Sequence, residues 1–116
     1  MGSEFYQKGT PVQLGPGLCI IRVPTNGRAF EYIGGEDPLL AATLGPAVIA
    51  GIQSRGVLAV AKHWIANAQE TDRQSIDSVV DDRTLHEIYY PGFAAAVDAG
   101  VAAVMCSYNR VNGACA

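Results

Sequence analysis

The chain has 116 residues, of which 49% are hydrophobic and 16% are charged, and its formal net charge is -3 at neutral pH. This composition is typical of a globular domain, and the length suffices for one small domain or for part of a larger one. The scattered Lys and Arg residues form no basic patch for nucleic acid, and no apolar run of about 18 residues indicates a membrane span.

Apolar runs separated by Gly and Pro predict three strands and two helices in alternation. In chain order they are a strand at 10–14, a helix at 38–54, a strand at 56–61, a helix at 83–99 and a strand at 101–108. Pro38 suits the first turn of a helix, where its missing N–H costs nothing, and Asp37 suits the N-cap. Gly45-Pro46 and Pro91-Gly92 interrupt the two helical patterns and predict kinks.

This order of elements predicts an α/β fold. Strands that alternate with helices form right-handed βαβ units, and such units build a parallel sheet. Three strands are less than half of a (β/α)₈ barrel, which takes about 250 residues. We therefore expect residues 1–116 to be a partial TIM-like barrel, with both ends of the domain missing.

Residues able to donate hydrogen bonds follow the predicted strands. Lys62 and His63 come directly after an apolar, buried strand, and Tyr108 closes the last one. Two arginines, Arg28 and Arg73, lie in the irregular segments at 18–37 and 67–83. Because barrels and open α/β sheets place their ligands at the carboxyl ends of the strands, this set predicts a site for a ligand with many hydroxyl or carboxylate oxygens.

Each of these side chains also has a purely structural interpretation. An arginine in a loop is commonly solvated or paired with a carboxylate. His63 fits a hydrogen-bonded core histidine, and Tyr108 and Met105 fit packing roles. The residues alone leave both interpretations open.

The carboxylates and cysteines indicate no catalytic dyad and no metal centre. Glu70 and Asp72 are expected to hold Arg73 or Lys62 in place, and Asp81-Asp82 suit the positive end of the second helix. The cysteines Cys19, Cys106 and Cys115 lack the spacing of metal ligands, so we interpret them as small apolar packing residues.

Seven runs form an ordered set of motifs over nearly the whole chain. They are Val12–Gly17, Pro24–Tyr32, Gly35–Pro38, Gly51–Ser54, Ala61–His63, Asn67–Arg73 and Met105–Gly113. In this order and spacing they resemble glycoside hydrolase family 3, in its β-glucosidase branch. The chain departs from the family at Ala29 and Ala68, where the family usually has Asn.

The resemblance implies a retaining β-glucosidase that needs no cofactor and no metal. Its substrate would be a small carbohydrate, with terminal β-D-glucosyl residues removed from cello-oligosaccharides such as cellobiose or from other β-glucosides. The residues that match the family's −1 subsite, which holds the terminal sugar, are Arg28, Lys62, His63, Arg73, Met105 and Tyr108. The family's nucleophile Asp and acid/base Glu match no position here, so the 116-residue chain alone is expected to be inactive.

Two other functions stay open at this stage. Lys62, as a lysine at a strand end, also suits a Schiff base in an aldolase-like barrel. A non-catalytic carbohydrate-binding or vestigial product is the other alternative. For the parent enzyme the resemblance implies secretion, although residues 1–116 contain no signal peptide, and the oligomeric state is left open.

Overall fold

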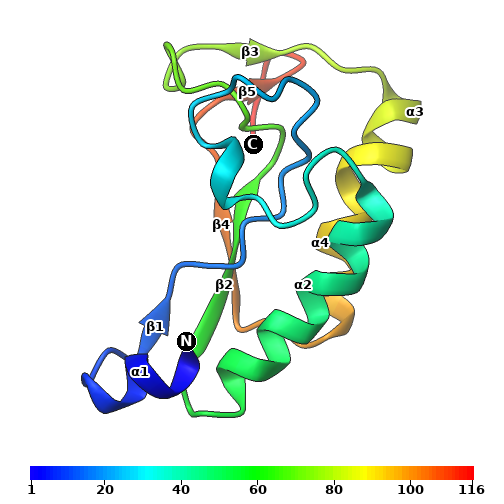
Figure 1. Ribbon diagram of the computed structural model, residues 1–116. Helices are drawn as coiled ribbons and strands as arrows, with labels where there is room; N and C mark the ends of the chain where they lie inside the picture. The colour runs from blue at the N-terminus through cyan, green and yellow to red at the C-terminus, as the bar shows by residue number, and fades with distance from the viewer.

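A parallel sheet of three strands forms the centre of the molecule (Figure 1). The strands β1, β2 and β4 lie in that order and are formed by Val12–Gln13, Leu58–Trp64 and Ala103–Cys106. In the computed structural model, which describes residues 1–116, Val12 pairs with Leu58, and Lys62 pairs with Met105. The predicted α/β class with parallel strands, as in part of a barrel, is thereby confirmed.

Two helices, α2 (Pro38–Gln53) and α4 (Tyr90–Asp98), pack side by side next to the sheet (Figure 1). The short helix α3 (Asp82–Thr84) and a π-helical turn, Leu85–Tyr89, lead into α4. The core lies between the helices and β2, and its buried members include Leu18, Ile49, Ile52, Ala59, Ala61, Phe93 and Ala96. The small alanine side chains of β2 let α2 and α4 approach the strand closely, so both helices pack on β2.

Helix α2 begins as its sequence predicts. The Asp37 carboxylate accepts hydrogen bonds from the N–H groups of Leu39 at 2.8 Å and Leu40 at 3.2 Å, and Pro38 occupies the first turn. These bonds satisfy donors that an uncapped helix would leave free. The helix runs through Pro46 to Gln53, one residue short of the expected end.

Several strand limits differ from the predicted ones. β2 continues to Trp64, so Lys62 and His63 belong to the last three residues of the strand instead of following it. β1 and β4 are shorter than the apolar runs that predicted them. Pairing sets these limits, because an apolar residue without a hydrogen-bonded neighbour strand is not part of a ladder.

A second, small sheet caps the carboxyl ends of β2 and β4 (Figure 1). β3 (Asp77–Ser78) runs parallel to β5 (Arg110–Val111), and β5 pairs antiparallel with β6 (Ala114–Cys115). The Asn112 amide joins both loops, because it accepts from the Val80 N–H at 2.9 Å and donates to its carbonyl at 2.7 Å. The irregular segment at 67–83 and the residues after Tyr108 therefore hold each other in place.

Residues 2–7, for which the sequence indicates no element, form helix α1 (Gly2–Gln7). Gly2 packs on α2, where a Cβ atom would lie only 3.0 Å from the Ile52 carbonyl oxygen. Tertiary contact, not helix propensity, thus explains this short helix. None of the helices combines the length and the apolar character that crossing a membrane requires.

Candidate functional site

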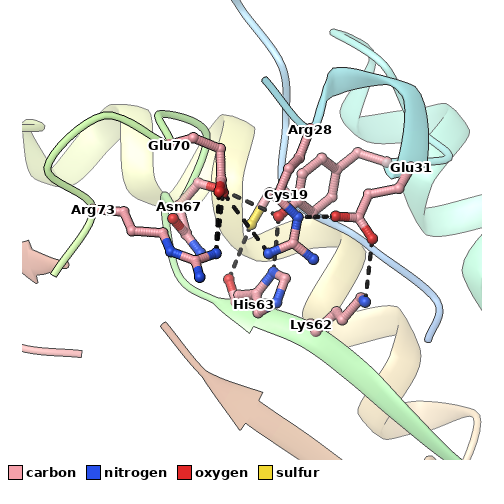
Figure 2. Close-up of polar contacts among 9 residues, drawn as sticks. Cys19, Arg28, Glu31, Lys62, His63, Asn67, Glu70 and Arg73 are labelled. Atoms are coloured by element: carbon pink, nitrogen blue, oxygen red, sulfur yellow. Dashed lines mark hydrogen bonds and ion pairs between the residues drawn. The ribbon is translucent and has the colours of Figure 1, made fainter. Parts of the chain in front are cut away.

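A chain of charged side chains lies at the carboxyl end of β2 (Figure 2). Three segments contribute to it, namely β2 itself, the 3₁₀ helix Ala29–Glu31 with the residue before it, and the loop after β2. We call it the ionic chain, and its members in order of contact are Lys62, Glu31, Arg28, Glu70 and Arg73.

Glu31 holds the first two cations of the ionic chain. Its Oε2 lies 3.2 Å from Nζ of Lys62, and its Oε1 accepts a hydrogen bond from Nε of Arg28. Burial alone would raise the pKa of the Glu31 carboxyl, but the hydrogen bonds from Arg28 and Lys62 outweigh it and lower that pKa. The hydrogen bond to Glu31 in turn raises the pKa of Arg28. Glu31 and Arg28 are therefore charged at neutral pH.

Glu70 holds both arginines from the other side. Its Oε2 lies 3.1 Å from Nη1 of Arg73, and its Oε1 lies 3.8 Å from Nη1 of Arg28. Three cations thus alternate with two carboxylates, which leaves one positive charge in excess. The carboxylates fix the cations in one arrangement, and the side chains of Lys62, Arg28 and Arg73 stay 13%, 23% and 32% exposed.

Tyr108 and Met105 extend this surface from the side of β4. The guanidinium carbon of Arg73 lies 4.9 Å from the centre of the Tyr108 ring, which is a cation–π contact. The Tyr108 side chain is 58% exposed, so one face of the aromatic ring remains accessible. Met105 is only half-buried and is the register partner of Lys62.

His63 lies beneath the ionic chain and is nearly buried, with 6% of its surface exposed. Its Nδ1 lies 2.8 Å from the Tyr32 hydroxyl, and its carbonyl accepts a hydrogen bond from the Cys19 thiol at 2.9 Å. Burial is the main cause, and together with the nearby charges of Arg28 and Lys62 it lowers the pKa of His63 from 6.5 to about 4. The imidazole is consequently neutral at physiological pH.

The structure brings the predicted cations together but changes their partners. Glu70 pairs with Arg73 as expected, whereas Lys62 is held by Glu31 and not by Glu70 or Asp72. Asp72 forms no ion pair, and only its carbonyl oxygen accepts hydrogen bonds. The prediction for Asp72 was wrong: Asp72 is an inner residue of the turn that the Arg73 N–H closes on the Glu70 carbonyl, and its φ there is 56°.

Sequence reasoning missed Glu31 and Tyr32 as members of the site. Glu31 has one usable signal, because it follows Arg28 by three residues and this spacing favours an ion pair on a helical turn. Tyr32 has no such signal, since its partner His63 is 31 residues away. Cys19 packs in the core as predicted and also donates a hydrogen bond to the His63 carbonyl. The packing interpretation was wrong for Cys106 and Cys115, which are exposed.

The chemistry of the site is that of a binding surface. Its free groups are N–H donors and an aromatic face, which suit the oxygens and the apolar faces of a polyhydroxylated ligand. Both of its carboxylates are engaged by cations, so neither is available as a nucleophile or a general acid. No group of three or more His, Cys, Asp or Glu side chains is arranged to hold a metal ion.

A hollow that is separate from the ionic chain lies against α4 and β4. Its volume is about 610 Å³ and its lining is apolar apart from one carboxylate. The lining residues are Trp64, Tyr90, Phe93, Ala94, Val97, Asp98, Val104 and Cys106. None of them belongs to the ionic chain, and the hollow offers few partners for hydroxyl groups, so we do not take it as the candidate site.

Comparison with known proteins identifies the family. The family model described as the glycosyl hydrolase family 3 N terminal domain matches residues 1–116. The chain belongs to this family. The resemblance of the seven runs is thus confirmed over the full length of the chain.

The relatives include enzymes for more than one sugar. A β-glucosidase from Rhizobium radiobacter is 50% identical over 97% of this chain, which spans 14% of that protein. An exo-alpha-(1->6)-L-arabinopyranosidase from Bifidobacterium longum is 46% identical over 97% of the chain and 15% of that protein. The chain thus spans about one seventh of the length of these relatives. Their names refer to different sugars, glucose in one and L-arabinopyranose in the other.

The solved structures agree with the observed fold. β-Glucosidase 3B from Thermotoga neapolitana, in complex with alpha-D-glucose, superposes with a TM-score of 0.94 at 43% identity. The match covers 99% of this chain and 16% of that protein. The relatives support a glycoside hydrolase with a carbohydrate substrate as the kind of protein in which this domain occurs.

Proposed function

We propose that the chain is part of a retaining β-glucosidase and supplies part of the subsite for the terminal β-D-glucosyl unit. In this proposal Arg28, Lys62, His63 and Arg73 donate hydrogen bonds to sugar hydroxyl oxygens, while Tyr108 and Met105 line the apolar side. The carrying observation is the ionic chain, in which two carboxylates orient three cations at the end of β2. A glucosyl unit has a hydroxyl on nearly every carbon, so several fixed donors can bind it at once.

The Schiff-base alternative has less support. A lysine that attacks a carbonyl must present a free amine, whereas Nζ of Lys62 lies 3.2 Å from a Glu31 carboxylate oxygen. The relatives are named as a β-glucosidase and an exo-alpha-(1->6)-L-arabinopyranosidase, which are glycoside hydrolases. Hydrolysis of a glycoside is therefore the reaction that we propose for the whole protein.

Binding is tested by titrating the 116-residue chain with D-glucose in a calorimeter or by NMR. We expect saturable binding that weakens at least about tenfold in Lys62→Ala, a loss of about 1.4 kcal/mol. Lys8→Ala is the matched control, because Lys8 is exposed and forms no ion pair. Equal affinity in wild type and Lys62→Ala would contradict the proposed subsite.

Catalysis is tested with an aryl β-glucoside. We expect no turnover by the chain alone, because the candidate site holds no free carboxylate to attack the anomeric carbon or to protonate the leaving group. Turnover that disappears in Lys62→Ala would show that the chain contains a catalytic pair and would overturn this expectation.

A further inference from the structure

We propose that Tyr32 sets the tautomer of His63, so that the imidazole presents an N–H donor at Nε2 to a bound sugar. The ligand in this statement rests on the proposed function, whereas the tautomer rests on the geometry of the chain alone. Tyr32 is a positioning residue in this proposal, because it acts on the ligand only through His63.

The two side chains meet from separate segments. Tyr32 ends the 3₁₀ helix Ala29–Glu31, and His63 lies on β2. The Tyr32 hydroxyl oxygen lies 2.8 Å from Nδ1 of His63, and the two rings meet edge to face with centroids 6.1 Å apart. Tyr32 is buried as well, with 4% of its surface exposed, so water does not compete for the hydrogen bond between its hydroxyl and His63.

The direction of the hydrogen bond follows from the second neighbour of the hydroxyl. Tyr32 has one proton to donate, and its hydroxyl lies 2.8 Å from Nδ1 of His63, which either donates or accepts according to the tautomer, and 3.3 Å from the Asn67 carbonyl oxygen, which only accepts. The longer distance exceeds the usual range for O–H···O bonds, so we assign the proton to the shorter contact, with Nδ1. Nδ1 then carries no proton, because a ring nitrogen accepts a hydrogen bond through its lone pair.

The protonation states are consistent with this direction. Burial raises the pKa of the Tyr32 phenol, so it keeps its proton. Burial and the positive charges nearby hold the pKa of His63 at about 4, so the ring carries a single proton at neutral pH. A neutral imidazole with an acceptor Nδ1 carries its proton on Nε2.

The charged groups that face His63 oppose a second proton. Arg28, Lys62 and Arg73 disfavour the imidazolium, whereas Glu31 acts in the opposite direction. Nε2 has no hydrogen bond within the chain and is not among the fully buried polar atoms that lack a partner. It is therefore accessible, and as a donor it matches the neighbouring ammonium and guanidinium groups in presenting N–H to ligand oxygens.

The backbone of His63 is held independently of Tyr32. The Cys19 thiol donates to the His63 carbonyl at 2.9 Å, and Lys62 and Trp64 on either side belong to the paired strand β2. Removing the Tyr32 hydroxyl should therefore let the imidazole proton of His63 occupy either ring nitrogen, while the backbone of His63 stays in place. This separation makes the tautomer measurable apart from the fold.

The test is long-range ¹H–¹⁵N NMR of the imidazole nitrogens in the full chain without ligand, at neutral pH. In the wild type we expect Nε2 to have the shift of a protonated nitrogen and Nδ1 that of a hydrogen-bonded acceptor. Tyr32→Phe should move Nδ1 and mix the two tautomers, whereas Tyr6→Phe, at a tyrosine that is 68% exposed, should change nothing. The chain has two histidines, and loss of one signal set in His63→Gln assigns the spectrum.

A proton on Nδ1 in the wild type would overturn the proposal, as would an unchanged His63 spectrum in Tyr32→Phe. The wild-type spectrum decides the tautomer even if Tyr32→Phe does not fold. D-Glucose is then added as the probe, and we expect Nε2 to shift and the affinity to fall about tenfold in Tyr32→Phe. If the ligand-free tautomer is as proposed and glucose shifts nothing, the proposed function fails and the assignment of Tyr32 stands.

Discussion

The carboxylate of Glu31 joins Arg28 to Lys62. One oxygen accepts from the Arg28 guanidinium, and the other lies 3.2 Å from the Lys62 ammonium. The three side chains are 13–23% exposed, so water screens the contacts only in part. Glu31 therefore decides where two of the proposed sugar-binding donors lie.

Replacement of Glu31 by Gln should separate these two cations. We expect the free energy of unfolding to fall by roughly 1–3 kcal/mol, because a partly buried charged hydrogen-bond partner is lost. Glucose affinity should fall with it, as Lys62 is no longer oriented. Urea unfolding and glucose titration measure the two effects. Glu36→Gln is the control, since Glu36 is exposed and unpaired, and equal results for the two variants would exclude a special role for Glu31.

The stability of the chain should depend on pH through His63. Its pKa is 6.5 in the unfolded reference and about 4 in the fold, so the unfolded chain binds more protons between these values. Stability therefore rises with pH in this window, is fully present above about 6.5 and is lost as pH falls toward about 4. His63→Gln should flatten this part of the profile, measured by urea unfolding at several pH values. His86→Gln, at an exposed histidine, should leave the slope intact, and the reverse pattern would contradict the prediction.

Arg73 and Tyr108 should be energetically coupled. The guanidinium carbon lies 4.9 Å from the ring centre, and the site is open to solvent on the Tyr108 side. Cation–π contacts at exposed sites contribute about 0.5–1 kcal/mol. A double-mutant cycle with Arg73→Ala and Tyr108→Leu should give a coupling energy of that size in unfolding experiments. Simple additivity of the two substitutions would show that the contact is not formed in solution.

The N-cap of α2 should contribute measurably to stability. The Asp37 carboxylate accepts from two helix N–H groups, and α2 packs on both β2 and α4. Asp37→Ala should lower the free energy of unfolding by about 1 kcal/mol. Glu36→Ala removes the neighbouring carboxylate, which makes no hydrogen bond to the helix, and it should have little effect. Thermal or urea unfolding of both variants provides the comparison.

The sequence indicates the elements around the site because their signals are local. Asp37 and Pro38 mark the start of α2, and the apolar run before Lys62 marks β2, with the limits shifted by a few residues. A cap or an apolar period acts within one or two turns, so neighbouring residues are enough to predict it. The ordered motifs likewise predicted the family, since they are properties of the sequence itself.

The partners within the site were decided by the tertiary structure. Glu31 meets Lys62, and Tyr32 meets His63, across 31 residues in each case, because the 3₁₀ helix turns back over the end of β2. The small sheet of β3, β5 and β6 arises in the same way from two loops that the sequence presents only as polar segments. Such contacts depend on the path of the whole chain, and no local pattern encodes that path. The sequence thus determined the family, the alternation of elements and the donors at the strand ends, whereas the fold determined which carboxylate orients each donor and which nitrogen of His63 faces outward.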